Sequence, residues 1–298
     1  MSSALILYNP ESGNQESEEV ALYLRESLQF KHQEIKLKAS QKPDDLIFFA
    51  QKAAEEDYER IYILGGDGSV HEVVNAIAEL KTCPTIGVIP TGTVNNCARM
   101  LNMPVNPWQA AERIGQAQKR KIDIGKINNQ YFVSTISAGS LPQSAAETSS
   151  ELKEQLGPAA YLVEGLQALQ DEEAKKYNLV LDGTKITDEY SLFLVALGNS
   201  VLGIENFFPE ASLNDGFLSV FGLKETTLLE KLSLLPDWFR ESEVDSEQFI
   251  KGRYQEIILA ADEGEEIETT VDGDPGPSSP LTISILPSHL SFLFLEDK

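Results

Sequence analysis

Residues 61–77 read IYILGGDGSVHEVVNAI and join an apolar run to three glycines, a carboxylate and a helical pattern. The apolar run predicts a buried strand, and the spacing of apolar residues after Ser69 predicts a helix. Glycines let another molecule approach the backbone closely, and the N–H groups at the start of the helix suit a phosphate. Two interpretations of Asp67 stay open. It holds a divalent cation beside a phosphate, or Asp67 or Ser69 simply caps the helix.

A second segment of the same kind follows along the chain. Residues 85–90 (TIGVIP) predict another buried strand, residues 91–96 (TGTVNN) predict a glycine-bearing turn, and a helix begins at Cys97. Two such strand–turn–helix segments place both turns at one edge of a parallel sheet, where open α/β folds bind ligands.

With these motifs the chain resembles the diacylglycerol kinase catalytic family, and most closely the soluble bacterial diacylglycerol kinases. The GGDG turn is shared with NAD kinases and phosphofructokinases. The similarity covers nearly the whole chain. Its motifs follow the family's order: residues 9–13 (NPESG), 65–69 (GGDGS), 89–96 (IPTGTVNN), 122–125 (IDIG), 156–162 (LGPAAYL), 214–216 (NDG) and 271–274 (VDGD).

The length of 298 residues predicts two domains. Strands and helices alternate up to about residue 120, which indicates a mostly parallel sheet with helices on its faces. Short strand candidates separated by Asn-Asn and Asp-Gly turns follow, a pattern typical of antiparallel β structure. We expect an α/β protein with a nucleotide-binding kinase domain at 1–125, plus about 290–298. A β-rich, sandwich-like lipid-substrate domain should occupy 126–289, and the resemblance implies that the last strand returns to the first domain.

Composition limits where the protein works. No apolar run approaches the ~20 residues that cross a bilayer. Met1-Ser2-Ser3 leads straight into a predicted strand, which leaves no room for a signal peptide. We therefore expect a cytoplasmic protein.

The net charge of −23 argues against nucleic acid as a partner and against strong attraction to anionic membranes. Peripheral membrane contact then needs a local basic or apolar patch, or another protein. Phe207 and Phe208 either line an acyl-chain pocket or belong to the core. The sequence does not fix the oligomeric state, and a homodimer is one alternative.

Phosphoryl transfer needs positioned phosphates, Mg²⁺ and a base near the attacking hydroxyl. The sequence has no GxxxxGK[ST], so a P-loop is excluded. Backbone N–H groups of the two glycine turns are the candidates for binding ATP phosphates. The resemblance implies that Asp67 belongs to the Mg²⁺–ATP site and that Asn9 and Thr93 line the nucleotide pocket. The cofactor-binding candidates are Asn9, Gly65, Gly66, Asp67, Gly68, Ser69, Gly92 and Thr93.

Two further carboxylates have alternative interpretations. The resemblance places Asp123 in a water–metal network at the domain junction, whereas the local sequence also fits an Asp that closes a strand turn. Asp215 lies in the family's metal-holding turn, where oxygen ligation suits Mg²⁺, although an Asp-Gly hairpin turn needs no metal.

Two positions depart from the family's pattern. The family's second glycine turn ends in Asn-Asp, and its late motif is Asp-Gly-Glu, whose Glu acts as base on the lipid hydroxyl. This chain has Asn96 and Asp274 at those positions. Asn carries no charge, unlike the Asp of the family. Asp is one methylene shorter than Glu, and a misplacement of a catalytic group by ~1 Å can cost ~10²-fold in rate. The catalytic candidates are therefore Asp67, Asn96, Asp123 and Asp274.

Three functions follow from these observations. The first is an ATP- and Mg²⁺-dependent kinase of diacylglycerol or a similar lipid alcohol. The second, favoured by the two departures, is a weak or inactive relative that binds nucleotide or lipid. The third is a kinase of another acceptor, such as a sphingoid base or NAD.

Overall fold

The computed structural model describes residues 3–10, 12, 16–138, 174–201, 203–225, 244–262 and 264–296. The motif at 156–162 and the helices expected near 152–170 and 226–242 lie outside these ranges. The chain forms two compact units. One comprises Met1–Ile124, Gln130–Val133 and Leu286–Lys298, and the other comprises Gly125–Asn129 and Ser134–Ile285.

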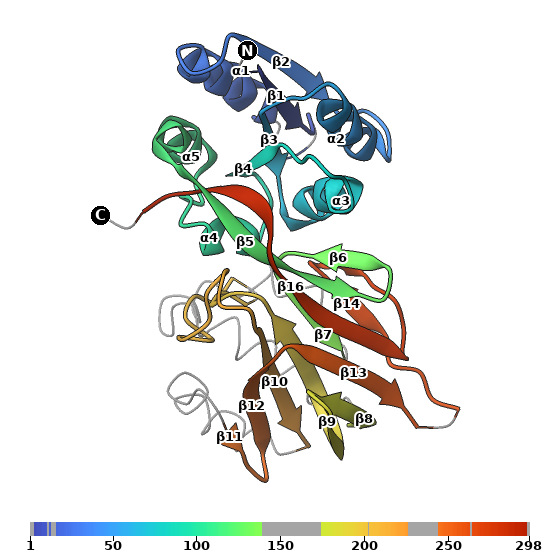
Figure 1. Ribbon diagram of the computed structural model, residues 1–298. Coiled ribbons are helices and arrows are strands. Elements are labelled where there is room, and N and C mark those ends of the chain that lie inside the picture. Colours follow the sequence, from blue (N-terminus) through green and yellow to red (C-terminus); the bar gives the residue numbers. More distant parts are fainter. Residues whose placement is uncertain are drawn as a thin grey trace. The chain divides into compact units, whose positions relative to one another are not determined.

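The first unit is built on a parallel sheet with the strand order β16-β4-β3-β1-β2. Its strands are β1 (Ser3–Tyr8), β2 (Glu34–Ala39), β3 (Arg60–Gly65), β4 (Thr85–Pro90) and the end of β16 (Leu281–Phe294). Its helices are α1 (Ser17–Leu28), α2 (Asp45–Glu55), α3 (Asp67–Ile77), α4 (Asn96–Met100), α5 (Pro107–Arg113) and the 3₁₀ turn η2 (Ile114–Gln116). Helices α1 and α5 contact each other on one side of the sheet, and α2 and α3 contact each other on the other side (Figure 1).

Apolar patterning explains this arrangement. All six residues of β4 are buried, as are the last five of β3, because helices cover both faces of a parallel sheet. Helix α3 buries Val70, Val73, Val74 and Ile77, which recur at helical spacing on one face. The predicted strand and helix on either side of the GGDG turn are therefore present.

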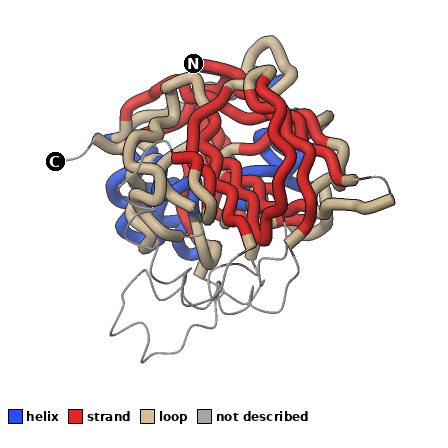
Figure 2. Tube along the Cα trace, turned by 90° about the horizontal axis from the view of Figure 1, so that it is seen from below, coloured by secondary structure: helices blue, strands red, loops and turns tan. Residues whose placement is uncertain are grey.

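The second unit is antiparallel, with the strand order β11-β12-β10-β9-β8-β13-β16, while β7 pairs with β9 and β14. Figure 2 shows its strands in red, lying side by side. Its strands are β7 (Thr135–Ala138), β8 (Lys175–Leu181), β9 (Thr184–Ala196), β10 (Leu218–Lys224), β11 (Val244–Asp245), β12 (Phe249–Tyr254), β13 (Glu256–Ala261), β14 (Thr269–Val271) and β15 (Asp274–Pro275).

Two long strands carry residues of both units, namely β5 (Gln118–Ile127) and β16. The sequence also suggests one short strand candidate over 127–136, but the structure divides this range among β5, β6 and β7. Asn128 takes a left-handed conformation (φ 49°) that ends β5 and starts a hairpin to β6 (Gln130–Phe132). The last strand is also longer than expected, since β16 begins at Leu281.

Phe207 and Phe208 are buried in the core of the second unit, in a cluster with Leu194, Phe221 and Phe249. The buried ammonium group of Lys251 donates a hydrogen bond to the Phe207 carbonyl (2.9 Å). In this structure both rings are therefore core residues. No helix in the described part of the chain combines the length and the apolar composition needed to cross a membrane.

Candidate functional site

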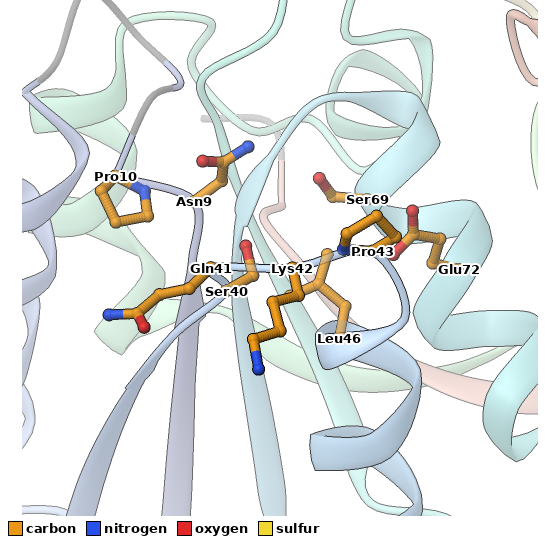
Figure 3. A pocket seen from close by; sticks show the side chains of 9 residues that line it. All are labelled: Asn9, Pro10, Ser40, Gln41, Lys42, Pro43, Leu46, Ser69 and Glu72. Carbon is orange, nitrogen blue, oxygen red and sulfur yellow. The ribbon is translucent and has the colours of Figure 1, made fainter.

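A cavity of about 420 Å³ lies beside the carboxyl ends of β1, β2 and β3 in the first unit. Because β2 lies on one side of β1 and β3 on the other, the chain changes direction across the sheet here, which is where open α/β sheets bind ligands. Asn9 and Ser69, both candidates from the sequence, line this cavity (Figure 3). Its other lining residues are Pro10, Ser40, Gln41, Lys42, Pro43, Leu46 and Glu72.

The residues that the sequence did not single out come mostly from the segment after β2, which supplies Lys42 as the cation among the lining residues. Glu72 projects from α3, one helical turn after Ser69. No motif marks the segment 40–43, and only the strand order brings it to the cavity.

The two glycine turns pack against each other through their backbones. A Cβ atom on Gly92 would lie 2.5 Å from the Cα atom of Gly66, and one on Gly65 would lie 2.4 Å from the Cβ atom of Ser69. The Thr91 amide donates a hydrogen bond to the Gly65 carbonyl (3.1 Å). A side chain at Gly92 would push the two turns apart, and one at Gly65 would collide with the Ser69 side chain of its own turn.

Asp67 connects the two turns. Its Oδ2 atom accepts a hydrogen bond from the Asn96 amide (3.0 Å), and its Oδ1 atom accepts one from the Cys97 amide (2.9 Å). These amides belong to the first turn of α4. The residue before Asp67, Gly66, is the N-cap of α3 and no side chain caps that helix. The simple capping interpretation is therefore wrong, because the carboxylate caps the neighbouring helix instead.

A chain of hydroxyl groups attaches the turn after β1 to the same assembly. The Ser12 hydroxyl donates a hydrogen bond to the Asn9 carbonyl (2.9 Å) and lies 3.1 Å from the Thr91 hydroxyl. Asn9 is thereby held near the second glycine turn. Neither hydroxyl was among the candidates from the sequence.

The second glycine turn is shaped by Asn95, which has a left-handed backbone (φ 57°). Its side chain bonds to both the amide and the carbonyl of Gly92 (3.0 and 2.7 Å). Asn96 is 5% exposed, and its amide contacts Asp67, so these two candidates lie together. Thr93 is exposed on the turn and is not among the residues that line the cavity.

Asp123 is 2% exposed, and its Oδ1 atom accepts a hydrogen bond from the Ser288 amide (2.7 Å). Ser288 has a left-handed backbone (φ 50°) within β16, so Asp123 supports an irregular position in that strand. Asp123 therefore has a structural role within the first unit, as the hydrogen-bond acceptor for Ser288.

In the second unit, Asp274 is exposed and directly follows a tight hairpin turn between β14 and β15. The turn residues Asp272 and Gly273 have φ values of 52° and 97°, and positive φ at both positions is characteristic of a type I′ turn. The Asp272 carboxylate is buried and accepts hydrogen bonds from the Ser134 amide, the Ser134 hydroxyl and the Thr135 amide (2.8, 2.8 and 3.1 Å).

Asp215 also lies in the second unit. Its carboxylate accepts hydrogen bonds from the amides of Ser212 (2.8 Å) and Phe217 (2.9 Å) and pairs with the Arg253 guanidinium (2.7 Å). This cation balances the charge of the carboxylate.

Within the described ranges, no three His, Cys, Asp or Glu side chains gather in a way that could hold a metal ion. Mg²⁺ is commonly bound by one or two carboxylates together with substrate phosphates and waters. A carboxylate has about four acceptor positions, and the two amides take one on each oxygen of Asp67. Asp67 is half-buried at the start of α3, the helix whose Ser69 and Glu72 line the cavity, and its carboxylate therefore fits a metal site completed by phosphate oxygens.

Two family models match the chain. Residues 3–127 match the diacylglycerol kinase catalytic domain, and residues 134–294 match the YegS C-terminal NAD kinase beta sandwich-like domain. A diacylglycerol kinase from Staphylococcus carnosus (strain TM300) is 32% identical over 99% of this chain and 95% of its own length. A diacylglycerol kinase from Staphylococcus epidermidis (strain ATCC 12228 / FDA PCI 1200) is also 32% identical, over 99% of this chain and 92% of its own.

Solved structures share the fold. A Bacillus anthracis str. Sterne crystal structure aligns with a TM-score of 0.86 and 23% identity, covering 99% of this chain and 97% of that one. A structure described as a diacylglycerol kinase from the same organism aligns with a TM-score of 0.78 and 22% identity over the same shares. The family models and the full-length relatives establish that this chain belongs to the diacylglycerol kinase catalytic domain family.

Proposed function

We propose that this protein is an ATP- and Mg²⁺-dependent lipid kinase that phosphorylates the hydroxyl group of diacylglycerol or a similar lipid alcohol. The observation that carries the proposal is the pair of glycine turns, packed backbone to backbone and joined by Asp67. Such turns leave backbone N–H groups and little side-chain bulk where phosphates would bind. Membership of the family supports the lipid acceptor.

ATP would occupy the cavity beside Asn9 and Ser69. Its volume of about 420 Å³ is within the range for small-molecule sites, ~300–1,000 Å³. Gly65, Gly66, Gly68, Gly92 and Thr93 would present amides or hydroxyls to the phosphates, and Lys42 would add positive charge at the rim. Glu72 and Asp67 are both acidic, so a nucleotide polyphosphate would need a divalent cation beside them.

Asp67 is the residue that would hold Mg²⁺. When bound, this ion neutralises charge that builds up on the phosphate oxygens. Asp215 remains a candidate for a structural ion. Since Arg253 already balances its charge, we expect such an ion to be weakly held.

Asp274 would serve as the base. Its carboxylate would accept the proton of the lipid hydroxyl while that oxygen bonds to the γ-phosphorus and ADP leaves. Exposure of Asp274 suits contact with a substrate. Asn96 and Asp123 would orient water and the Asp67 region through hydrogen bonds. We further propose a cytoplasmic protein in peripheral contact with the membrane, and a homodimer stays a prediction.

A second candidate, an inactive relative that still binds nucleotide, is favoured by Asn96 and Asp274 themselves. The neutral amide lacks the charge of an Asp, and the shorter acid reaches less far than a Glu. NAD is a third acceptor to test, because the second family model describes an NAD kinase-like β-sandwich.

Transfer of radiolabelled phosphate from ATP to diacylglycerol in mixed micelles with Mg²⁺ tests the proposal, with a sphingoid base and NAD as parallel acceptors. We expect transfer to diacylglycerol that Asp274→Ala abolishes. If ATP binds but no acceptor is labelled, even by the variant combining Asn96→Asp and Asp274→Glu, the inactive relative is the correct description.

A further inference from the structure

We infer that Asp272 is a positioning residue for Asp274, acting as a buried clamp that fixes where the exposed carboxylate is presented. The inference rests on the proposed function for the role of Asp274, but the clamp itself is a feature of the second unit alone.

The hairpin that carries Asp274 is short. Strands β14 and β15 share two residue pairs, Thr270 with Pro275 and Val271 with Asp274. One member of the first pair is a proline, which has no N–H group to donate. The Gly276 amide also donates a hydrogen bond to the Thr269 carbonyl (2.8 Å). Contacts outside the hairpin add to this short ladder in setting the direction in which Asp274 leaves the turn.

Those contacts are made by Asp272. Its amide donates a hydrogen bond to the Thr135 carbonyl (2.8 Å), extending the pairing of β14 with β7. Its Oδ1 atom then accepts three hydrogen bonds, from the Ser134 amide, the Ser134 hydroxyl and the Thr135 amide. The side chain is 3% exposed, so it cannot itself meet a substrate hydroxyl.

The charge of Asp272 matters because three donors converge on one buried oxygen. Hydrogen bonds to an ionised acceptor are roughly twice as strong as neutral ones. Without that acceptor, the Ser134 and Thr135 amides would lose a buried partner. Asp is also one of the few residues that tolerates a positive φ at this turn.

The chain offers a matched control in another Asp-Gly turn. Asp182 and Gly183 join β8 to β9 with φ values of 46° and 83°, again positive at both positions. The Asp182 carboxylate also accepts hydrogen bonds from neighbouring amides, those of Gln255 (3.0 Å) and Glu256 (2.8 Å). That turn carries no proposed catalytic group and is exposed.

The test compares Asp272→Asn with Asp182→Asn. Asn tolerates the positive φ of both turns, so each substitution leaves the backbone conformation possible. It removes the negative charge and replaces one carboxylate oxygen with an NH2 group. We expect Asp272→Asn to lower kcat by ~10²-fold, as a ~1 Å misplacement does, with an unchanged KM for ATP. Asp182→Asn should leave kcat unchanged.

Amide hydrogen exchange tests the clamp without activity. The Ser134, Thr135 and Asp274 amides should exchange faster in Asp272→Asn than in wild type, and at wild-type rates in Asp182→Asn. If exchange behaves in this way but wild type transfers no phosphate to any lipid alcohol, the proposed function fails and the clamp stands. Wild-type kcat in Asp272→Asn, equal losses in both variants, or unchanged exchange would overturn the inference.

Discussion

Asp67-Gly68 in the first unit and Asp272-Gly273 in the second have the same two residues and use them differently. Asp67 is half-buried, begins the helix whose Ser69 and Glu72 line a cavity, and accepts hydrogen bonds from two amides at the start of α4. Asp272 has a left-handed backbone in a hairpin and is buried, and one of its carboxylate oxygens accepts three hydrogen bonds.

The difference shows that an Asp-Gly motif does not by itself identify a catalytic carboxylate. Both aspartates tie together segments that are far apart in sequence, but Asp67 begins the helix whose Ser69 and Glu72 line a ligand-sized cavity, whereas Asp272 is buried. In the second, the group suited to chemistry is two residues further on, at Asp274. The following predictions test this contrast, from the largest expected effect to the smallest.

Asp67→Asn should have the largest effect on activity. The change removes the charge that would hold Mg²⁺, and we expect kcat to fall by about 10³-fold, the upper range for loss of one group that stabilises transition-state charge. It also replaces one acceptor with a donor facing an amide of α4, which should cost ~1–3 kcal/mol of stability. Steady-state kinetics and thermal unfolding measure the two effects, and near-wild-type kcat would remove Asp67 from the mechanism.

Gly92→Ala tests the tight packing of the two glycine turns of the first unit. Its new methyl group would meet the Gly66 backbone at 2.5 Å, and we expect a loss of ~1–3 kcal/mol in the free energy of unfolding, with weaker ATP binding. Gly115→Ala is the control in the same unit, because the nearest atom to its Cβ lies at 3.6 Å. Equal destabilisation of both variants in denaturant titrations would show that the turns do not need close contact.

Asp274→Glu and Asn96→Asp should each raise kcat, by up to ~10²-fold for the first because it restores the reach of the base. The double variant should differ from the product of the single effects, since both groups would serve one transition state. Kinetics on all four proteins form the cycle. A fall in kcat for Asp274→Glu would mean that the turn is already adapted to the shorter acid.

The Asp-Gly turn at Asp215 should give the smallest effect. If it holds a divalent ion, chelation should lower the melting temperature by about 2–4 °C for each kcal/mol lost, and Asp215→Asn should remove that sensitivity. Scanning calorimetry with and without Mg²⁺ measures it. A wild type insensitive to chelation would mean that the Arg253 ion pair and the two amide hydrogen bonds support this turn without a metal ion.

Much of the fold could be predicted from the sequence, because strand and helix periods and glycine turns are local signals. The alternation before residue 120 indicated the parallel sheet, and the Asp-Gly turns indicated the antiparallel unit. The contacts within the candidate site were harder to predict from the sequence. Asp67 caps a helix that begins 29 residues later, and Asp272 binds Ser134, 138 residues earlier. Such partners depend on strand order, so sequence patterns suggested a cation ligand or a cap of its own helix for Asp67, not its bonds to α4, and gave Asp272 no role.

Calorimetric titration of Mg²⁺–ATP into wild type, Asp67→Asn and Asp272→Asn tests the division between the two turns most directly. The account predicts that Asp67→Asn weakens Mg²⁺–ATP binding strongly, while Asp272→Asn binds as wild type does although its kcat is reduced. Unchanged affinity in Asp67→Asn, or an equal loss of affinity in both variants, would contradict it.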